Sequence, residues 1–153
     1  MDHHDAVALI AAAVGRSSGV WADLGAGTGT FTRALADLLA AGSRIYAVDR
    51  DGRAVRALRS LNRGDVEIIP VRADFATCDL RGVLGDTAVD GVLLANALHF
   101  VRDADEVLRR IVRDFWTGVR LVVEYHPRAP SRWVPFLIAP AIARCASVDE
   151  PSP

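Results

Sequence analysis

The sequence predicts an α/β fold, a Rossmann-like three-layer sandwich on a mainly parallel sheet of about five strands. Short apolar runs rich in β-branched residues alternate with longer helical patterns. The apolar runs lack the polar alternation of strands with one solvated face, as expected for strands covered on both sides. Strand and helix repeated in this way favour a parallel sheet with right-handed crossovers. We expect one domain over residues 1–153, with a core at 17–126 and an atypical tail at 127–153.

Five apolar runs are the expected strands. They are GVWADL (19–24), SRIYAVD (43–49), VEIIPV (66–71), VDGVLLAN (89–96) and VRLVVEY (119–125). In an open parallel sheet, ligands bind in the crevice outside the carboxyl ends of the strands. The residues that follow these runs are therefore the first place to look for a site.

Helical patterns lie between the strands, at residues 30–41, 52–61, 80–84 and 104–115. In the last of these, apolar residues recur at three- and four-residue spacing and form a stripe that includes Val107 and Ile111. Arg109, Arg110 and Arg113 fall outside this stripe. A first helix is expected at VALIAAAV (7–14), which is too short to span a membrane.

The composition is that of an ordinary globular protein, with 51% hydrophobic and 24% charged residues. The net charge of −1 gives no long-range field of the kind used by nucleic-acid binders, so we expect neither a nucleic-acid nor a membrane partner. Cys78 and Cys145 form no CxxC pair, which favours a reducing, cytoplasmic location. His3 and His4 have no second cluster of ligands at a suitable spacing, so no metal is expected.

The stretch VWADLGAGTGTFTRAL, residues 20–35, places three alternate glycines between a strand and a helix. Glycine permits positive φ and lets a ligand approach the main chain, so Gly25, Gly27 and Gly29 indicate a tight ligand-binding turn. The dinucleotide fingerprint GxGxxG fails at its last position, where Thr30 stands. An NAD-dependent oxidoreductase is therefore a weaker alternative.

Asp23 followed by the alternate glycines gives DxGxGxG, which resembles motif I of the class I S-adenosylmethionine-dependent methyltransferases. Further matches follow in the order of that family. Asp49 closes IYAVD, Asp74 and Phe75 stand in VRADFAT, and VDGVLLANALHF is similar to the motif IV strand and loop. The resemblance covers residues 17–126 and implies a Rossmann-like domain with S-adenosyl-L-methionine as cofactor.

The resemblance also implies roles for single residues. It implies that Asp49 accepts hydrogen bonds from both ribose hydroxyls, that Asp74 accepts from the exocyclic amine of adenine, and that Phe75 flanks the ring. Two other interpretations stay open, because Asp49 also fits a helix cap and Asp74 a turn residue. The cofactor-binding set implied is Asp23, Leu24, Gly25, Ala26, Gly27, Gly29, Asp49, Arg50, Asp74, Phe75 and Asn96.

Methyl transfer from a sulfonium is a direct displacement, so the protein mainly positions the acceptor and supplies a base only for a protonated nucleophile. His99, three residues after Asn96, is the candidate base, with packing or hydrogen bonding as the alternative role. The sequence ANAL at the motif IV position lacks the Asn/Asp-Pro-Pro-aromatic pattern of amino-methylating DNA enzymes. The resemblance therefore implies a small-molecule acceptor.

Members of this family usually continue past the fifth strand with two more strands. Here 28 residues follow Tyr125, rich in proline and alanine, without a further strand pattern. The unpaired edge of the fifth strand needs cover, so we expect the tail or a second copy in a homodimer to cover it, or the chain to be a truncated form. A non-catalytic remnant that still binds S-adenosylmethionine is the main alternative to an active methyltransferase.

Overall fold

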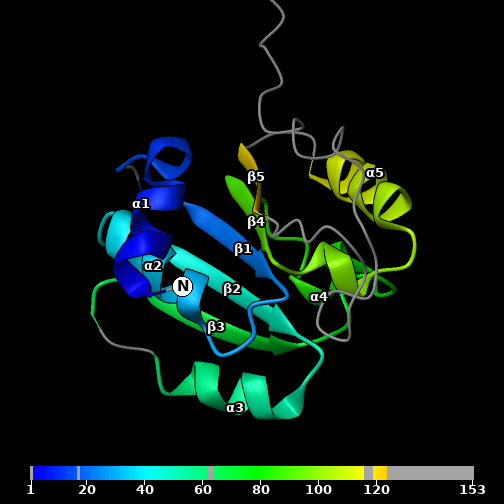
Figure 1. Cartoon of the computed structure of the whole chain (residues 1–153), viewed down its shortest axis with the longest axis horizontal. Coiled ribbons are helices and arrows are strands. Elements are labelled where there is room, and N and C mark those ends of the chain that lie inside the picture. Colours follow the sequence, from blue (N-terminus) through cyan, green and yellow to red (C-terminus); the bar gives the residue numbers. More distant parts are fainter. Residues whose placement is uncertain (1, 17, 62–63, 116–118, 124–153) are drawn as a thin grey trace, which may run out of the picture.

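A computed structural model describes residues 2–16, 18–61, 64–115 and 119–123. Its centre is a parallel five-stranded sheet in the order β3-β2-β1-β4-β5, which confirms the predicted fold class (Figure 1). The strands are β1 (Val20–Leu24), β2 (Arg44–Asp49), β3 (Glu67–Arg72), β4 (Gly91–Ala95) and β5 (Val119–Val123). The ends of β1, β2 and β3 lie within one residue of the expected runs, β4 is shorter than its run, and β5 is described as far as Val123.

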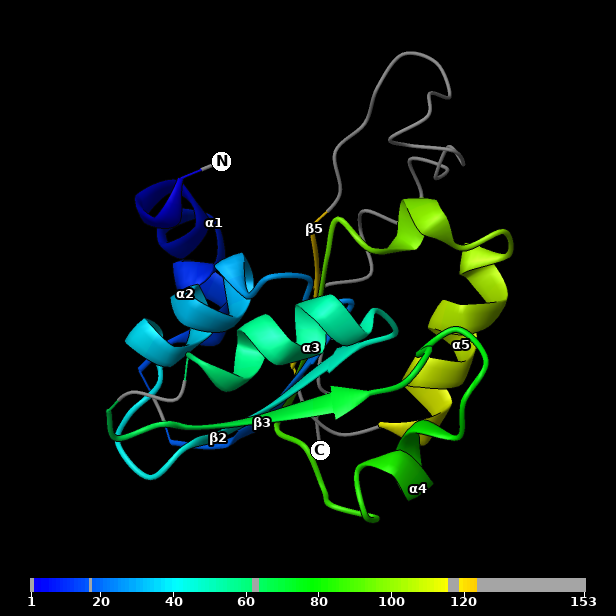
Figure 2. The same cartoon turned by 90° about the horizontal axis from the view of Figure 1, so that it is seen from below.

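Helices cover both faces of the sheet and complete the three layers. Figure 2 shows α1, α2 and α3 on one side and α4 and α5 on the other. Their bounds are α1 (His3–Val14), α2 (Thr30–Leu38), α3 (Gly52–Arg59), α4 (Leu80–Val83) and α5 (Ala104–Asp114), with a 3-10 turn η1 (Leu98–Phe100) after β4. The predicted helices at 52–61, 80–84 and 104–115 are confirmed, with ends one or two residues earlier.

The core lies on both faces of the sheet, because neighbouring residues of a strand point to opposite sides. In β1, Trp21 packs in a cluster with Ile10 of α1, whereas Ala22 packs in a second cluster with Ile111 of α5. All four side chains are almost fully buried. Burial on both faces explains why the apolar runs lack polar alternation.

The helix α2 ends earlier than its alanine-rich sequence predicts. Leu39 leaves the helical region with ψ 148, and Gly42 reverses the chain with φ +82. The amide and the hydroxyl of Ser43 both donate to the carbonyl of Ala40. These turn bonds compete with helical ones, so the predicted continuation over residues 39–41 is wrong.

The helix α1 begins earlier than predicted, at His3, because Asp2 caps it. The Asp2 carboxylate accepts a hydrogen bond from the amide of Asp5 at 2.8 Å, a standard N-cap contact. His3 Nε2 then lies 2.6 Å from Asp37 Oδ2, which links the start of α1 to α2. The helix buries Ile10 and leaves Leu9 half exposed.

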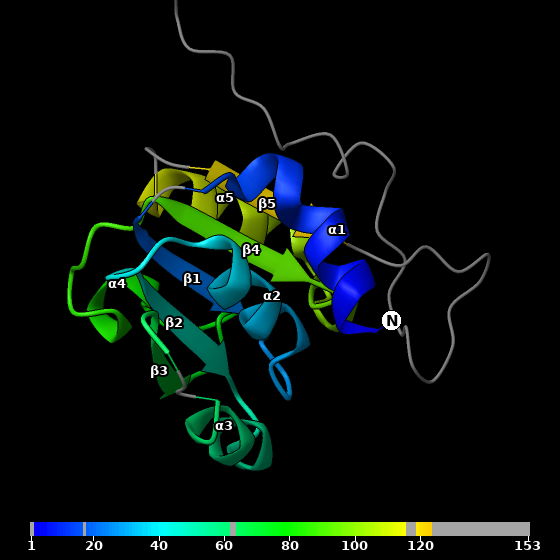
Figure 3. The same ribbon diagram turned by 90° about the vertical axis from the view of Figure 1, so that its left-hand side faces the viewer.

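The order of the strands creates a crevice at the carboxyl ends of the sheet. β1 lies between β2 and β4, so the chain extends the sheet in one direction through β3 and then crosses to the other side (Figure 3). The loops after β1 and β4 therefore leave the sheet in opposite directions. This reversal places a gap above the carboxyl ends of the strands.

Some expectations fall outside the described residues. These are the tail at 127–153, the last residues of the run at 119–125 and any cover that the tail gives to β5. Among the helices that the structure describes, none has both the length and the apolar character needed to cross a membrane.

Candidate functional site

A cavity of about 490 Å³ lies at the carboxyl ends of β1 to β4. Pockets of this size are typical of small-molecule and cofactor sites. Eight of the residues predicted to bind a cofactor line it, from all four strand ends. They are Gly25, Ala26, Gly27, Asp49, Arg50, Asp74, Phe75 and Asn96.

The start of the glycine turn is fixed by its backbone. Gly25 has φ +78, and a Cβ at this position would lie 2.6 Å from the Cβ of Ala97. The amides of Gly25 and Ala26 both donate to the carbonyl of Val48, at 2.8 and 3.0 Å. Only glycine fits here, because both the dihedral angle and the close approach of the loop after β4 exclude a side chain.

The middle of the turn is held by Asp49. Gly27 has φ +55 and its amide donates to Asp49 Oδ2 at 2.8 Å, while Asp49 Oδ1 accepts from the amide of Asp51 at 2.8 Å. A Cβ on Gly27 would meet no protein atom within 4 Å, so the main chain faces open space there. Asp51 is the N-cap of α3, so the interpretation of Asp49 as the helix cap is wrong. Each Asp49 oxygen keeps a lone pair for a ligand hydroxyl.

Three predicted residues support the turn from below instead of lining the cavity. Asp23 and Leu24 are 1% and 0% exposed. A side chain on Gly29, at φ +91, would overlap Leu61, so this glycine permits close packing of the turn against the residues after α3. Asp23, Leu24 and Gly29 are not among the residues that line the cavity, so direct contact between them and the cofactor stays a prediction.

Asp23 is a buried acid with one side-chain partner. Its Oδ2 accepts a hydrogen bond from Thr32 Oγ1 at 2.7 Å, which joins the end of β1 to α2. Burial raises the pKa of Asp23 to about 6; the bond from Thr32 lowers it, and the negative charge of Asp49 adds to the rise. Near neutral pH this carboxylate is an internal charge beneath the turn.

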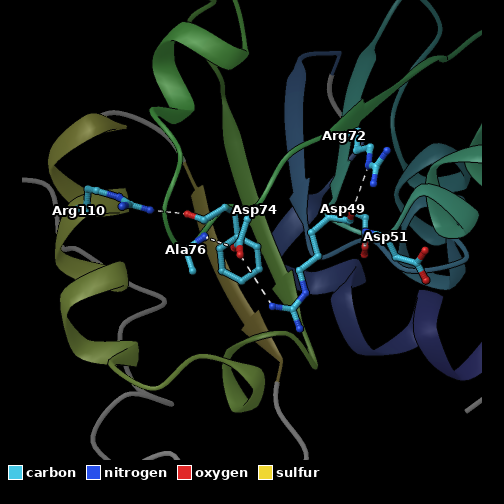
Figure 4. A network of polar contacts seen from close by, with 8 residues as sticks. Asp49, Asp51, Arg72, Asp74, Ala76 and Arg110 are labelled. Atoms are coloured by element: carbon cyan, nitrogen blue, oxygen red, sulfur yellow. Dashed lines mark hydrogen bonds and ion pairs between the residues drawn. The ribbon is translucent and has the colours of Figure 1, made fainter.

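The segment after β3 is organised by Asp74. Its Oδ1 accepts from the amide of Ala76 at 3.0 Å (Figure 4). Its carbonyl accepts from the amides of Thr77 and Cys78. Asp74 is therefore a turn residue, as the alternative interpretation held, and its carboxylate also lines the cavity. Oδ2 lies 3.8 Å from Arg50 Nη1, an exposed ion pair of little energetic weight.

The loop after β4 places Asn96, and not His99, against the cavity. Asn96 has φ +53, a conformation that is uncommon outside glycine and is tolerated best by asparagine. His99 is 5% exposed and is not among the lining residues, whereas Phe100 is 49% exposed and lines the cavity. The geometry does not support His99 as the base, because the η1 turn directs this side chain into the protein, with its ring 4.2 Å from that of Phe100.

Sequence reasoning missed several lining residues and one support. Thr28, Phe31, Phe100 and Val101 line the cavity, and the first two stand inside or next to the glycine motif, where they were within reach of prediction. Arg110 of α5 donates from Nη2 to the carbonyl of Phe75 (Figure 4). Nothing in the sequence indicates that contact. Within the described part of the chain, no group of three or more His, Cys, Asp or Glu side chains is placed to hold a metal ion.

The sheet order, the glycine turn and the acids after β2 and β3 are those expected for the class I S-adenosylmethionine-dependent methyltransferase fold. Residues 22–123, more than half of the chain, match the family model described as a methyltransferase domain. The chain belongs to this family. The resemblance of its motifs is thereby confirmed, and S-adenosylmethionine is the cofactor of the class. No curated protein matches the chain.

Solved structures share the fold over most of this chain. The YcgJ protein from Bacillus subtilis is 21% identical with a TM-score of 0.63, over 85% of this chain and 53% of that one. The CcbJ methyltransferase from Streptomyces caelestis is 27% identical with a TM-score of 0.56, over 76% and 50%. The glycopeptide N-methyltransferase MtfA complexed with sinefungin is 21% identical with a TM-score of 0.61, over 80% and 54%. The chain spans about half the length of these structures.

Proposed function

We propose that this chain binds S-adenosylmethionine in the cavity and transfers its methyl group to a small-molecule acceptor. One observation carries the proposal: Asp49 and Asp74 line the same cavity as the glycine turn at Gly25 and Gly27. Two carboxylates and a glycine main chain stand at three neighbouring strand ends. They suit a ligand that has a diol and an amine as hydrogen-bond donors and a flat ring that packs close to the main chain. Adenosine has all three.

The proposed contacts follow from the groups that remain available. Asp49 uses one lone pair of each oxygen within the protein, so both oxygens keep capacity for the two ribose hydroxyls. Asp74 uses Oδ1 for Ala76, and its Oδ2, whose ion pair with Arg50 Nη1 is long at 3.8 Å, keeps capacity to accept from the adenine amine. Phe75 borders the ring position, and Gly27 lets the amino acid end of the cofactor approach the main chain. Asn96 and Arg50 complete the proposed set.

When bound, S-adenosylmethionine would supply a methyl group carried on positively charged sulfur. A lone pair of the acceptor would bond to the methyl carbon while the carbon–sulfur bond breaks and its electrons stay on sulfur. The protein's part is to align the acceptor and exclude water. Among the described lining residues, the ionisable ones are Asp49, Arg50 and Asp74, all assigned to the adenosine side. We therefore assign no base within this part of the chain.

The acceptor is proposed to enter beside the loop after β4. Phe100 and Val101 give that wall an apolar surface, with Phe100 half exposed. A small organic acceptor suits such a wall better than a phosphate backbone, and the net charge of −1 also argues against nucleic acid. The similar glycopeptide N-methyltransferase, complexed with sinefungin, supports both the cofactor site and this acceptor class.

We also propose that the domain spans residues 1–153 with its core at 17–126, and that the protein is cytoplasmic. β5 is the last strand of the described sheet and pairs only with β4 there, which supports a homodimer through that edge. Sedimentation equilibrium tests the dimer, because a monomer at micromolar concentration would contradict it.

Transfer from S-adenosylmethionine labelled in the methyl group to a small-metabolite extract tests the main proposal. At a cofactor concentration below the wild-type Kd, we expect labelled product with the wild type and with Asp51→Ala, and about thirtyfold less with Asp49→Ala. Binding of S-adenosylhomocysteine without any transfer would instead favour the non-catalytic remnant. Binding of NADH with none of S-adenosylhomocysteine would contradict the proposal as a whole.

A further inference from the structure

Arg110 departs from the other arginines of its helix. Arg109 is exposed and pairs with Glu106 on the same helix, whereas Arg110 is half-buried and reaches across to the carbonyl of Phe75. Arg110 Nε is buried and has no hydrogen-bond partner in the described structure. Removing part of a guanidinium from water costs free energy, so an arginine without a task here would extend into solvent. Within the described part of the chain, its hydrogen bond is to the segment after β3.

That contact fixes one peptide unit from both ends. The carbonyl of Phe75 and the amide of Ala76 belong to the same trans peptide, so they point in opposite directions. Arg110 holds the carbonyl, and Asp74 Oδ1 accepts from the amide at 3.0 Å (Figure 4). The amides of Thr77 and Cys78 also hold this turn through the Asp74 carbonyl, so loss of Arg110 removes one restraint on the peptide plane and loosens the amide that holds Asp74 Oδ1.

We propose that Arg110 is a positioning residue for adenine recognition. By holding the peptide between Phe75 and Ala76, it fixes the Asp74 carboxylate with Oδ1 engaged and Oδ2 left for the exocyclic amine. The bond from a charged donor to a carbonyl is stronger than a neutral one, which suits this task. This inference rests on the proposed function, because it assumes adenosine in the cavity.

A purely structural role for Arg110 predicts a different result. If Arg110 only joins α5 to the rest of the protein, its loss weakens every adenosine-like ligand by the same factor. If it acts through Asp74, its loss removes the preference for an amine at position 6 of the purine. S-inosylhomocysteine carries a carbonyl oxygen at that position. This oxygen would face the Asp74 carboxylate, and two acceptors cannot form a hydrogen bond.

Calorimetric titration of the whole chain with S-adenosylhomocysteine and S-inosylhomocysteine separates the two roles. We expect the wild type and the control Arg109→Met to prefer the adenosine compound by at least about thirtyfold. In Arg110→Met, we expect the preference to fall to about threefold or less, mainly through weaker binding of the adenosine compound. An unchanged preference in Arg110→Met overturns the inference.

Two further measurements keep the result clear. In an Asp74→Ala background, Arg110→Met should change the preference by less than about twofold, because both residues act through one contact. Should circular dichroism show that Arg110→Met is unfolded, Arg110→Ala, which also lacks a donor for the Phe75 carbonyl, replaces it, and a preference equal to the wild type's overturns the inference. Failure of the wild type to bind S-adenosylhomocysteine contradicts the proposed function itself, whereas binding with preference independent of Arg110 contradicts only this inference.

Discussion

The segments after β1 and after β3 line the same cavity but are held in different ways. The first is held by its backbone: Gly25 and Gly27 have positive φ, and their amides bond to Val48 and Asp49. The second is held by side chains, because those of Asp74 and Arg110 bond the peptide that joins Phe75 to Ala76. In a turn held by its backbone, an added side chain disrupts the whole turn. In a turn held by side chains, each substitution removes one contact and weakens the turn in part. Substitutions at the two segments should therefore differ in severity.

The largest expected effect is that of Gly25→Ala. A methyl group at φ +78 and 2.6 Å from Ala97 Cβ combines backbone strain with overlap, at a cost of about 4 kcal/mol. We expect no measurable heat on titration with S-adenosylhomocysteine. Gly85→Ala is the matched control, since Gly85 has φ +65 and open space around its Cβ, and it should lose about 1 kcal/mol of stability but bind normally. Equal binding by the two variants would show that the turn is not held as described.

The next effect concerns Asp23, beneath the same turn, and depends on pH. Its pKa is about 6 in the folded protein against an ordinary value of 3.8, so the folded state holds the proton more tightly. The contribution of Asp23 to stability is therefore full below about pH 4 and is lost as pH rises through 6, a difference of about 3 kcal/mol at most. Asp23→Asn carries no such dependence.

Urea unfolding of both proteins at pH 4 and pH 7 measures this contribution. We expect the wild type to lose stability relative to Asp23→Asn as the pH rises, because other carboxylates contribute equally to both proteins. A difference between the two proteins that stays constant over this range would show that Asp23 is not a desolvated acid.

A smaller effect is expected for Asp49→Ala, at the border of the turn. It removes the acceptor of the Gly27 amide and both proposed ribose contacts, so S-adenosylhomocysteine should bind about thirtyfold more weakly by calorimetry. Asp51→Ala is the control, because it removes the N-cap of α3 at a cost of about 1 kcal/mol of stability without a proposed ligand contact. Equal affinities of the two variants would remove Asp49 from the site.

The smallest effect on binding is expected for His99→Ala. The side chain is buried outside the cavity lining, so we expect a loss of about 1–3 kcal/mol of unfolding free energy and affinity for S-adenosylhomocysteine within about twofold of the wild type. The pH profile of methyl transfer should also keep its shape. A lost acidic limb of that profile, where protonation of a base would otherwise reduce the rate, with affinity retained, would restore the base role that the sequence suggested.

The backbone-held segment was the predictable one. Glycines at alternate positions after an apolar run indicate a backbone conformation that other residues rarely adopt. Asp49 could be predicted as a site residue because it directly ends a strand. Strand ends converge in any parallel sheet, which placed Asn96 at the site, whereas Asp74 was predicted from the resemblance to the family. The sheet class and most helices were predictable for the same reason, since apolar periodicity reports burial directly.

The side-chain-held contacts were not predictable. Arg110 bonds a main-chain carbonyl 35 positions away. Every residue has such a carbonyl, so the sequence does not indicate which one Arg110 bonds. In the loop after β4, the residue type favoured His99, but the local η1 turn places Phe100 in the cavity instead. Asp23 was expected to line the site because it precedes the glycines, yet it lies on the core side of the turn and bonds Thr32.

A crystal structure of the chain with S-adenosylhomocysteine tests the central claim most directly. The account predicts that the ribose hydroxyls lie within hydrogen-bond distance of Asp49 and that the adenine amine lies next to Asp74, with Phe75 against the ring. Density for the ligand elsewhere, or in this cavity with the adenine away from Asp74, would contradict it.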